Sequence, residues 1–158
     1  MTRDEILALE GRELDVAVAE SIFGWHWTRG REAHSTDDTV YRWLHPPKSY
    51  TNFTPATGDE PMLGGSIYFV PAYSADIGMA WQIVDYMLDW DGPFWWDDFS
   101  MRSHRSADDS SWTWGAGFRY WTFPQNETTV IVEAMGNTAP LAICRAALLA
   151  AQKDKEDE

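Results

Sequence analysis

Two stretches, one near the N-terminus and one in the middle of the chain, have apolar positions every three to four residues, which is the period of an amphipathic helix. The first is preceded by residues 2–5, which fit a capping box, and is predicted to stop at Gly24. The second is predicted to begin at Ser74, which can cap it, and to end in the turn at residues 91–93. The stripe of the first helix consists of Leu14, Ala17, Val18 and Ile22.

Residues 25–70 have no sustained period and are interrupted by several prolines. Short strands are predicted around 39–44 and 66–70. A connection of this length inside a compact domain is often functional, so this segment is the first candidate for a binding loop.

From residue 94 the period changes to two, which is typical of strands. Short turns separate the runs, so they are predicted to form an antiparallel meander. A final helix is predicted to begin at Asn137 and Thr138 and to run through the alanine-rich segment that follows. The three predicted strands cover residues 94–103, 111–123 and 128–134.

The predicted order is helix, irregular segment, helix, three strands, helix. Aromatic residues occupy both faces of the strand 111–123, so both faces of the sheet need a cover if Trp112, Trp114 and Trp121 are to be buried. The prediction is an α/β (α+β) protein, a three-layer α/β/α sandwich with a mostly antiparallel sheet of three to five strands. We expect one domain over residues 1–152 and a charged, disordered tail at 153–158.

The chain carries 12 basic and 25 acidic residues, a net charge of −13. This balance argues against a nucleic-acid duplex or an anionic membrane as a partner. Acidity can serve solubility, or it can dock the protein on a basic host protein. We expect no signal peptide and no membrane span, because no apolar run approaches about 18 residues.

No motif in the chain indicates catalysis, so we expect a protein that is not an enzyme and that uses no cofactor or metal. The four histidines lack ligand spacing, and the acidic residues near Asp91 lack the spacing of a calcium loop. Cys144, in an alanine-rich helix, is expected to be a small buried side chain.

Binding chemistry concentrates at two places. The predicted helix start at Tyr73 and Ser74 offers backbone N–H groups to an anion and a ring beside them. The segment before it mixes cations with rings that can pair with phosphate and stack on bases. We expect a ligand where residues 25–50 fold over that helix start; solvated loop cations are the alternative. The candidate ligand-binding residues are Trp25, Trp27, Arg42, Trp43, Tyr73, Ser74 and, on the sheet, Arg119.

The stretch YMLDWDGPFWWDDF at residues 86–99 places three tryptophans among acidic residues. Neighbouring residues of a strand point to opposite faces, so Trp95 and Trp96 cannot share one core. We expect Trp96 to be buried and Trp95 to be partly exposed.

Three segments resemble the phage ABA sandwich domain proteins, a family of small phage and prophage proteins. They are the opening MTRDEILALEGRELDVAVAESIFGW, the central VPAYSADIGMAW and the closing NTAPLAICRAALLA. The resemblance spans almost the whole chain, and it implies an α/β/α sandwich, a phage or prophage origin and action in the host bacterial cytoplasm. It implies no reaction.

Two functions remain open. The first is a non-enzymatic phage accessory protein that binds a small nucleotide-like ligand, an anti-defence sponge that sequesters a host immune signal. The second is an acidic protein that inhibits a host defence enzyme by binding it directly. A homodimer is a further expectation.

Overall fold

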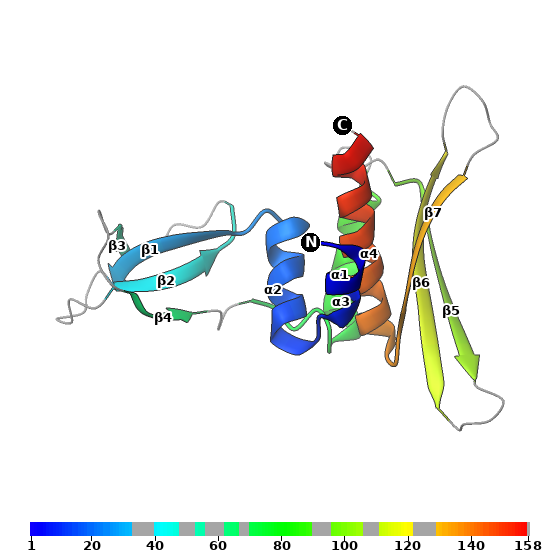
Figure 1. Ribbon diagram of the computed structural model, residues 1–158, viewed down its shortest axis with the longest axis horizontal. Coiled ribbons are helices and arrows are strands. Elements are labelled where there is room, and N and C mark those ends of the chain that lie inside the picture. The colour runs from blue at the N-terminus through cyan, green and yellow to red at the C-terminus, as the bar shows by residue number, and fades with distance from the viewer. Residues whose placement is uncertain are drawn as a thin grey trace.

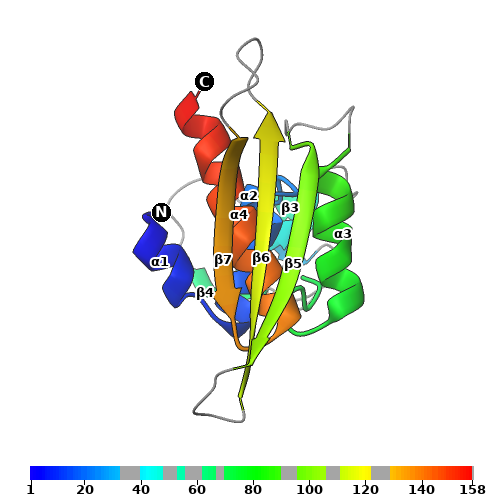
Figure 2. The same ribbon diagram turned by 90° about the vertical axis from the view of Figure 1, so that its right-hand side faces the viewer.

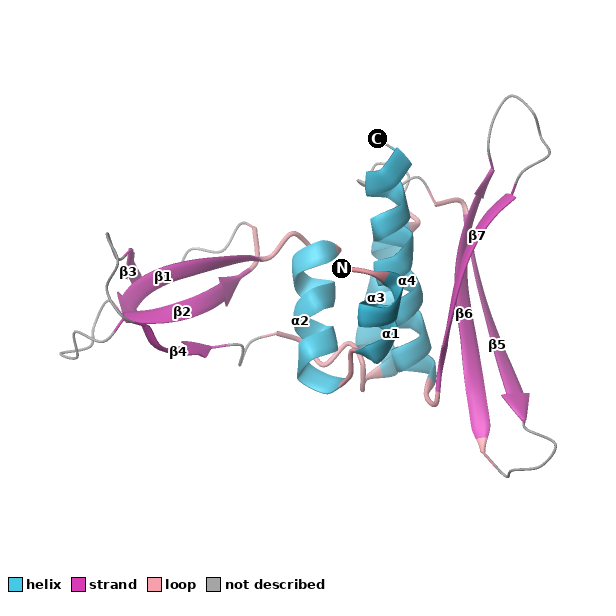
Figure 3. Ribbon diagram, in the orientation of Figure 1, coloured by secondary structure: helices cyan, strands magenta, loops and turns pink. Residues whose placement is uncertain are grey.

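The computed structural model contains four helices and two β-sheets in the part of the chain that it describes (Figures 1 and 3). The described residues are 1–32, 40–47, 53–55, 62–66, 70–89, 96–105, 111–121 and 129–157. The helices are α1 (Arg3–Ala8), α2 (Gly11–Ser21), α3 (Ile77–Met87) and α4 (Ala139–Asp157). The strands are β1 (His26–Glu32), β2 (Val40–His45), β3 (Phe53–Pro55), β4 (Met62–Ser66), β5 (Asp98–Arg105), β6 (Trp112–Trp121) and β7 (Thr129–Gly136).

The C-terminal strands form the predicted antiparallel meander, with β6 in the centre of the order β5-β6-β7. The register pairs Phe99 with Phe118 across β5 and β6, and Phe118 with Val132 across β6 and β7. These three residues therefore line one face of the sheet, and Phe118 is fully buried there.

All described helices lie on that one face of the β5–β6–β7 sheet (Figures 1 and 2). Helix α4 packs directly on β6 and β7, and each of α1, α2 and α3 packs against α4. The alanines and leucines of α4 are almost all buried, because this helix touches the sheet on one side and three helices on the others. The core of the protein is this helix and its neighbours.

The four remaining strands form a second, mixed sheet of order β3-β1-β2-β4. It extends away from α2, on the side opposite the meander (Figure 1). Leu44 of β2 is buried, and Trp27 of β1 packs against the core, so the base of the β1–β2 pair is anchored to the helices. The predicted strand at 39–44 is confirmed by β2. Most of the strand expected at 66–70 lies outside the described residues; β4 ends at Ser66.

The α+β class and the antiparallel sheet are thus confirmed. The three-layer order is not seen among the described residues, because the second face of the meander carries no described helix (Figure 2). Trp112 lies on the helix-facing side of β6, as Phe118 does, but it sits at the start of the strand and is 52% exposed, so the burial expected for this ring is not seen. The side chain of Trp121, which alternation places on the second face, lies outside the described residues. Trp96 is buried as predicted, and Trp95 lies outside the described residues.

The helix boundaries follow local chemistry. Thr2 and Glu5 form the predicted capping box of α1, and Gly24 adopts a positive φ of 66° just past α2, as a helix stop requires. Helix α3 begins later than predicted, because the side chain of Asp76, and not that of Ser74, accepts the capping hydrogen bond from Met79 N–H. Helix α4 continues to Asp157, so most of the expected disordered tail is helical. No helix in the described ranges is long and apolar enough to cross a membrane.

Candidate functional site

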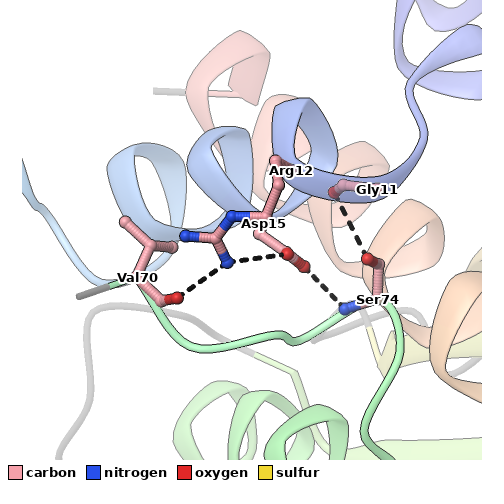
Figure 4. A network of polar contacts seen from close by, with 5 residues as sticks. All are labelled: Gly11, Arg12, Asp15, Val70 and Ser74. Atoms are coloured by element: carbon pink, nitrogen blue, oxygen red, sulfur yellow. Dashed lines mark hydrogen bonds and ion pairs between the residues drawn. The ribbon is translucent and has the colours of Figure 1, made fainter. Parts of the chain in front are cut away.

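The predicted site at the start of α3 is occupied by a network of protein contacts (Figure 4). The Asp15 carboxylate of α2 accepts a hydrogen bond of 2.7 Å from the backbone N–H of Ser74. The Arg12 guanidinium lies 3.2 Å from the same carboxylate and donates to the carbonyl of Val70 at 2.8 Å. The Ser74 hydroxyl donates to the carbonyl of Gly11. The network joins the start of α2 to residues 70–74.

Asp15 is the described polar residue that lies deepest in the core, with 2% of its surface exposed. A buried carboxylate is stable only when hydrogen-bond donors surround it, and Ser74 and Arg12 provide them. The N–H group of Ser74, which was expected to bind an external anion, is therefore bound by the protein's own Asp15 carboxylate.

Tyr73 is also part of the core. Its ring stacks on Phe23 with centroids 5.2 Å apart, and only 4% of its surface is exposed. Burial raises the pKa of its hydroxyl to about 12, and the nearby negative charge of Asp15 adds to the shift. Tyr73 and Ser74 thus hold the fold together at the place where a ligand was expected.

The predicted site residues of the preceding segment are only partly described. Trp25 and Trp27 are partly buried and pack against the core. In the β1–β2 ladder, Arg42 lies opposite Arg29, and Trp43 lies opposite Thr28. The side chains of Arg42 and Trp43 lie outside the described part of the structure.

Arg119, the predicted site residue on the sheet, belongs to a different surface. It lies on the face of the meander that points away from the helices, which we call the outer face. By the strand register, this face carries Asp98, Ser100, Arg102 and His104 of β5, Thr113, Gly115, Gly117 and Arg119 of β6, and Ile131, Glu133 and Met135 of β7.

Two ion pairs lie across the outer face. Arg119 contacts Asp98 at 3.4 Å, and Arg102 contacts Glu133 at 3.0 Å. The second pair joins β5 to β7 over the whole width of β6. The two side chains can meet because the residues of β6 beneath them are glycines, which have no side chains in the way. A Cβ on Gly117 would lie 2.8 Å from Cγ of Glu133, and one on Gly115 would lie 3.1 Å from Sδ of Met135.

Between these side chains lies an open groove of about 120 Å³. Its floor is the glycine-containing centre of β6, and its walls come from β5 and β7. Pockets that enclose a drug-sized ligand measure roughly 300–1,000 Å³, so this groove has room for a group the size of a phosphate. The lining residues are Ser100, Arg102, His104, Gly115, Ala116, Gly117, Glu133 and Met135.

Other chemistry in the described residues is limited. Cys144 is fully buried, and burial raises the pKa of its thiol, so the reactive thiolate is disfavoured. Within the described ranges, no group of three or more His, Cys, Asp or Glu residues could hold a metal ion.

The sequence identified Arg119 but not the groove that lies on the same face of the sheet. Arg102 and Glu133 are far apart in the sequence, and only the register of three strands brings them together. One local signal was present: Gly115 and Gly117 alternate in the middle of a strand, where glycine weakens pairing and often marks the close approach of another group.

Comparison with known proteins gives one result. No curated protein and no solved structure matches the chain. A family model, the phage ABA sandwich domain, matches residues 16–148, which include the meander, α3 and most of α2 and α4. The match covers most of the chain and agrees with the helices and antiparallel sheet described above. The chain belongs to the phage ABA sandwich domain family.

Proposed function

We propose that the chain is a non-enzymatic phage accessory protein that binds a small nucleotide-like ligand on the outer face of the meander. In the host bacterial cytoplasm it sequesters an immune signal of the host. The observation that supports this most is a cluster of cationic side chains on a face that is close to neutral, because Asp98 and Glu133 only balance its two arginines. Arg102, Arg119 and His104 gather on one sheet face of a chain whose net charge is −13.

The two arginines can exchange their present partners for a phosphate. Arg102 and Glu133 are 62% and 50% exposed, and exposed ion pairs contribute only about 0–1 kcal/mol. A phosphate offers more acceptor oxygens than one carboxylate, and a guanidinium can bind it through two parallel hydrogen bonds. Glu133 then turns away from the groove into solvent.

The glycines explain why the ligand fits here. Side chains at 115 and 117 would occupy the space above β6, and their absence lets a phosphate approach the floor of the groove. The groove accepts the phosphate alone, so the rest of the ligand lies along the open sheet. A ligand with two or three phosphates can contact Arg102 and Arg119 together.

The proposal is tested by calorimetric titration and thermal melting with cyclic dinucleotides, cyclic trinucleotides and ADP-ribose. A ligand that binds the native state raises the melting temperature by mass action. Arg102→Gln should weaken binding about tenfold, or roughly 1.4 kcal/mol. Arg105→Gln, on the same strand but outside the groove, is the matched control and should bind normally. If none of the probes binds at a ligand concentration of about 100 μM, which is a hundred times a micromolar dissociation constant, the proposal is wrong.

A second function has its own supporting observation. Helices α1 and α2 and the link between them expose a series of carboxylates, which can attract a basic surface of a host defence enzyme so that the protein inhibits it directly. These residues are Asp4, Glu5, Glu10, Glu13 and Glu20.

Salt dependence separates this function from the first. Capture of a host enzyme by immobilised protein should fall when salt is raised, because ions screen charges between exposed surfaces. Glu13→Gln with Glu20→Gln should reduce capture and leave nucleotide binding unchanged. Capture that is insensitive to both salt and this double substitution would count against an acidic docking surface.

A further inference from the structure

The two edges of the meander are treated differently by the rest of the molecule. At the β7 edge, Arg3 of α1 donates to the carbonyl of Glu133 at 3.3 Å. Arg145 of α4 donates to the carbonyl of Met135 at 3.2 Å. Side chains that bind the free carbonyls of an edge strand prevent another strand from pairing there. The β7 edge is therefore closed.

The alternation of an antiparallel ladder shows which groups lie on the other edge. The carbonyls of residues 133 and 135 point away from β6, so the backbone groups of the even-numbered residues of β7 point toward β6. They pair with even-numbered residues of β6, which leaves the backbone groups of its odd-numbered residues to bond to β5. Even positions of β5 then face β6, which agrees with the hydrogen bond from Thr113 to the carbonyl of His104.

The backbone N–H and C=O groups of Phe99, Met101 and Ser103 must consequently lie along the outer edge of β5. Among the contacts of the described residues, none engages these groups. An unpaired edge of this length is a template for another strand.

The sequence of this edge is complementary to itself. Residues 98–102 read Asp-Phe-Ser-Met-Arg. If a second copy of β5 lies antiparallel to the first with Ser100 at the two-fold axis, Asp98 lies opposite Arg102 and Phe99 lies opposite Met101. Opposite charges and paired apolar residues at directly opposed positions stabilise an antiparallel pair. A shift of the axis to Arg102 would place two guanidinium groups together.

We propose that two copies of this chain pair through their β5 edges, about a two-fold axis at Ser100, into one continuous six-stranded sheet. In this register the 99–101 pairs are hydrogen-bonded and the Ser100 pair is not, as the orientation of the edge groups requires. Across the joined outer face, charges of opposite sign then follow one another. Glu133 and Arg102 belong to the first copy, and Asp98 and Arg119 belong to the second.

Helix α3 supplies an independent observation. It lies beside β5 (Figure 2), and its Ile77 and Trp81 are 46% and 40% exposed. The Trp81 ring meets Phe99 edge-on, with centroids 5.5 Å apart. Large apolar side chains next to an open strand edge are typical of an interface. Pairing through β5 brings the two α3 helices together and removes these apolar side chains from water.

A disulfide tests the axis directly. In a non-hydrogen-bonded antiparallel pair the Cα atoms are about 4.5 Å apart, within the range that a disulfide can join. Ser100→Cys should therefore form a covalent dimer under mild oxidation. Thr113→Cys, on the same outer face but one strand further in, should stay monomeric on a non-reducing gel. Cys144 does not interfere, because it is fully buried.

A proline substitution tests the edge without a new cysteine. Ser103→Pro removes an N–H group that faces the open edge, and it should shift the mass measured by light scattering from two chains to one. Ile131→Pro removes the equivalent group of the closed β7 edge and should remain a dimer. A monomeric native protein would overturn the proposal. So would a dimer in which Ser100→Cys fails to cross-link or Thr113→Cys cross-links instead, since the latter would indicate packing of two outer faces.

Discussion

Asp15 shows how one side chain can decide whether backbone groups are free to bind a ligand. Its carboxylate accepts the hydrogen bond from the N–H group of Ser74, which the sequence alone predicts to be free for a ligand. The sequence could not reveal this, because Asp15 precedes Ser74 by 59 positions and looks like an ordinary polar residue of an amphipathic helix. Its burial depends on the way α2 packs against residues 70–74.

The network predicts a stability change for Asp15→Asn. Asparagine can still accept from Ser74, but it removes the charge that faces Arg12, and hydrogen bonds to charged groups contribute about 1.5–3 kcal/mol. Because Arg12 is 42% exposed, we expect a loss near the lower end, about 2 kcal/mol, in urea unfolding. Glu13→Gln, at an exposed position of the same helix, should change the free energy of unfolding by less than about 0.5 kcal/mol. Equal effects of the two substitutions would show that the network contributes little.

Tyr73 predicts how stability depends on alkaline pH. Its pKa is about 12 in the folded protein and near 10 in an unfolded chain. The unfolded state therefore loses this proton first, and the free energy of unfolding should fall as pH rises from 10 to 12. Tyr73→Phe keeps a ring against Phe23 but cannot ionise, so its stability should fall less over the same interval. Parallel curves for the two proteins, measured by urea unfolding at each pH, would contradict this assignment.

At the scale of elements, periodicity predicted most of the C-terminal half. The strands β5, β6 and β7 and the helix α4 all lie within a few residues of their predicted positions, because each shows a regular apolar period. The start of α3 was misplaced, because Ser74 and Asp76 are both good caps and only the backbone decides between them. The outer face was missed because it depends on register, which a single strand does not reveal.

The junction between β7 and α4 predicts a position that tolerates only glycine. A Cβ on Gly136 would lie 2.8 Å from the backbone nitrogen of Ala142 and 3.1 Å from Cβ of Leu141. Backbone atoms cannot move aside, so Gly136→Ala should cost about 2 kcal/mol or more in unfolding experiments. Gly115→Ala is the matched control. It meets only the flexible end of Met135 at 3.1 Å and should cost less than about 1 kcal/mol.

For the whole molecule, the net charge of −13 predicts a response to salt. Repulsion among so many carboxylates opposes the compact state, and dissolved ions screen it. At constant protein concentration, the melting temperature should rise by roughly a few degrees between low and moderate salt. Glu13→Gln with Glu20→Gln should show a smaller rise. A melting temperature that falls with salt would mean that attractive ion pairs outweigh the repulsion.

Arg3 and Arg145 on the β7 edge determine how large an assembly can become. A sheet with two free sides adds strands at both and extends indefinitely, as fibrils do. With one side covered by guanidinium groups, the pairing that we propose through β5 would end as soon as two chains meet, and its product would have a fixed stoichiometry. Arg3 and Arg145 are thus expected to protect a concentrated solution of this protein against gelation and precipitation.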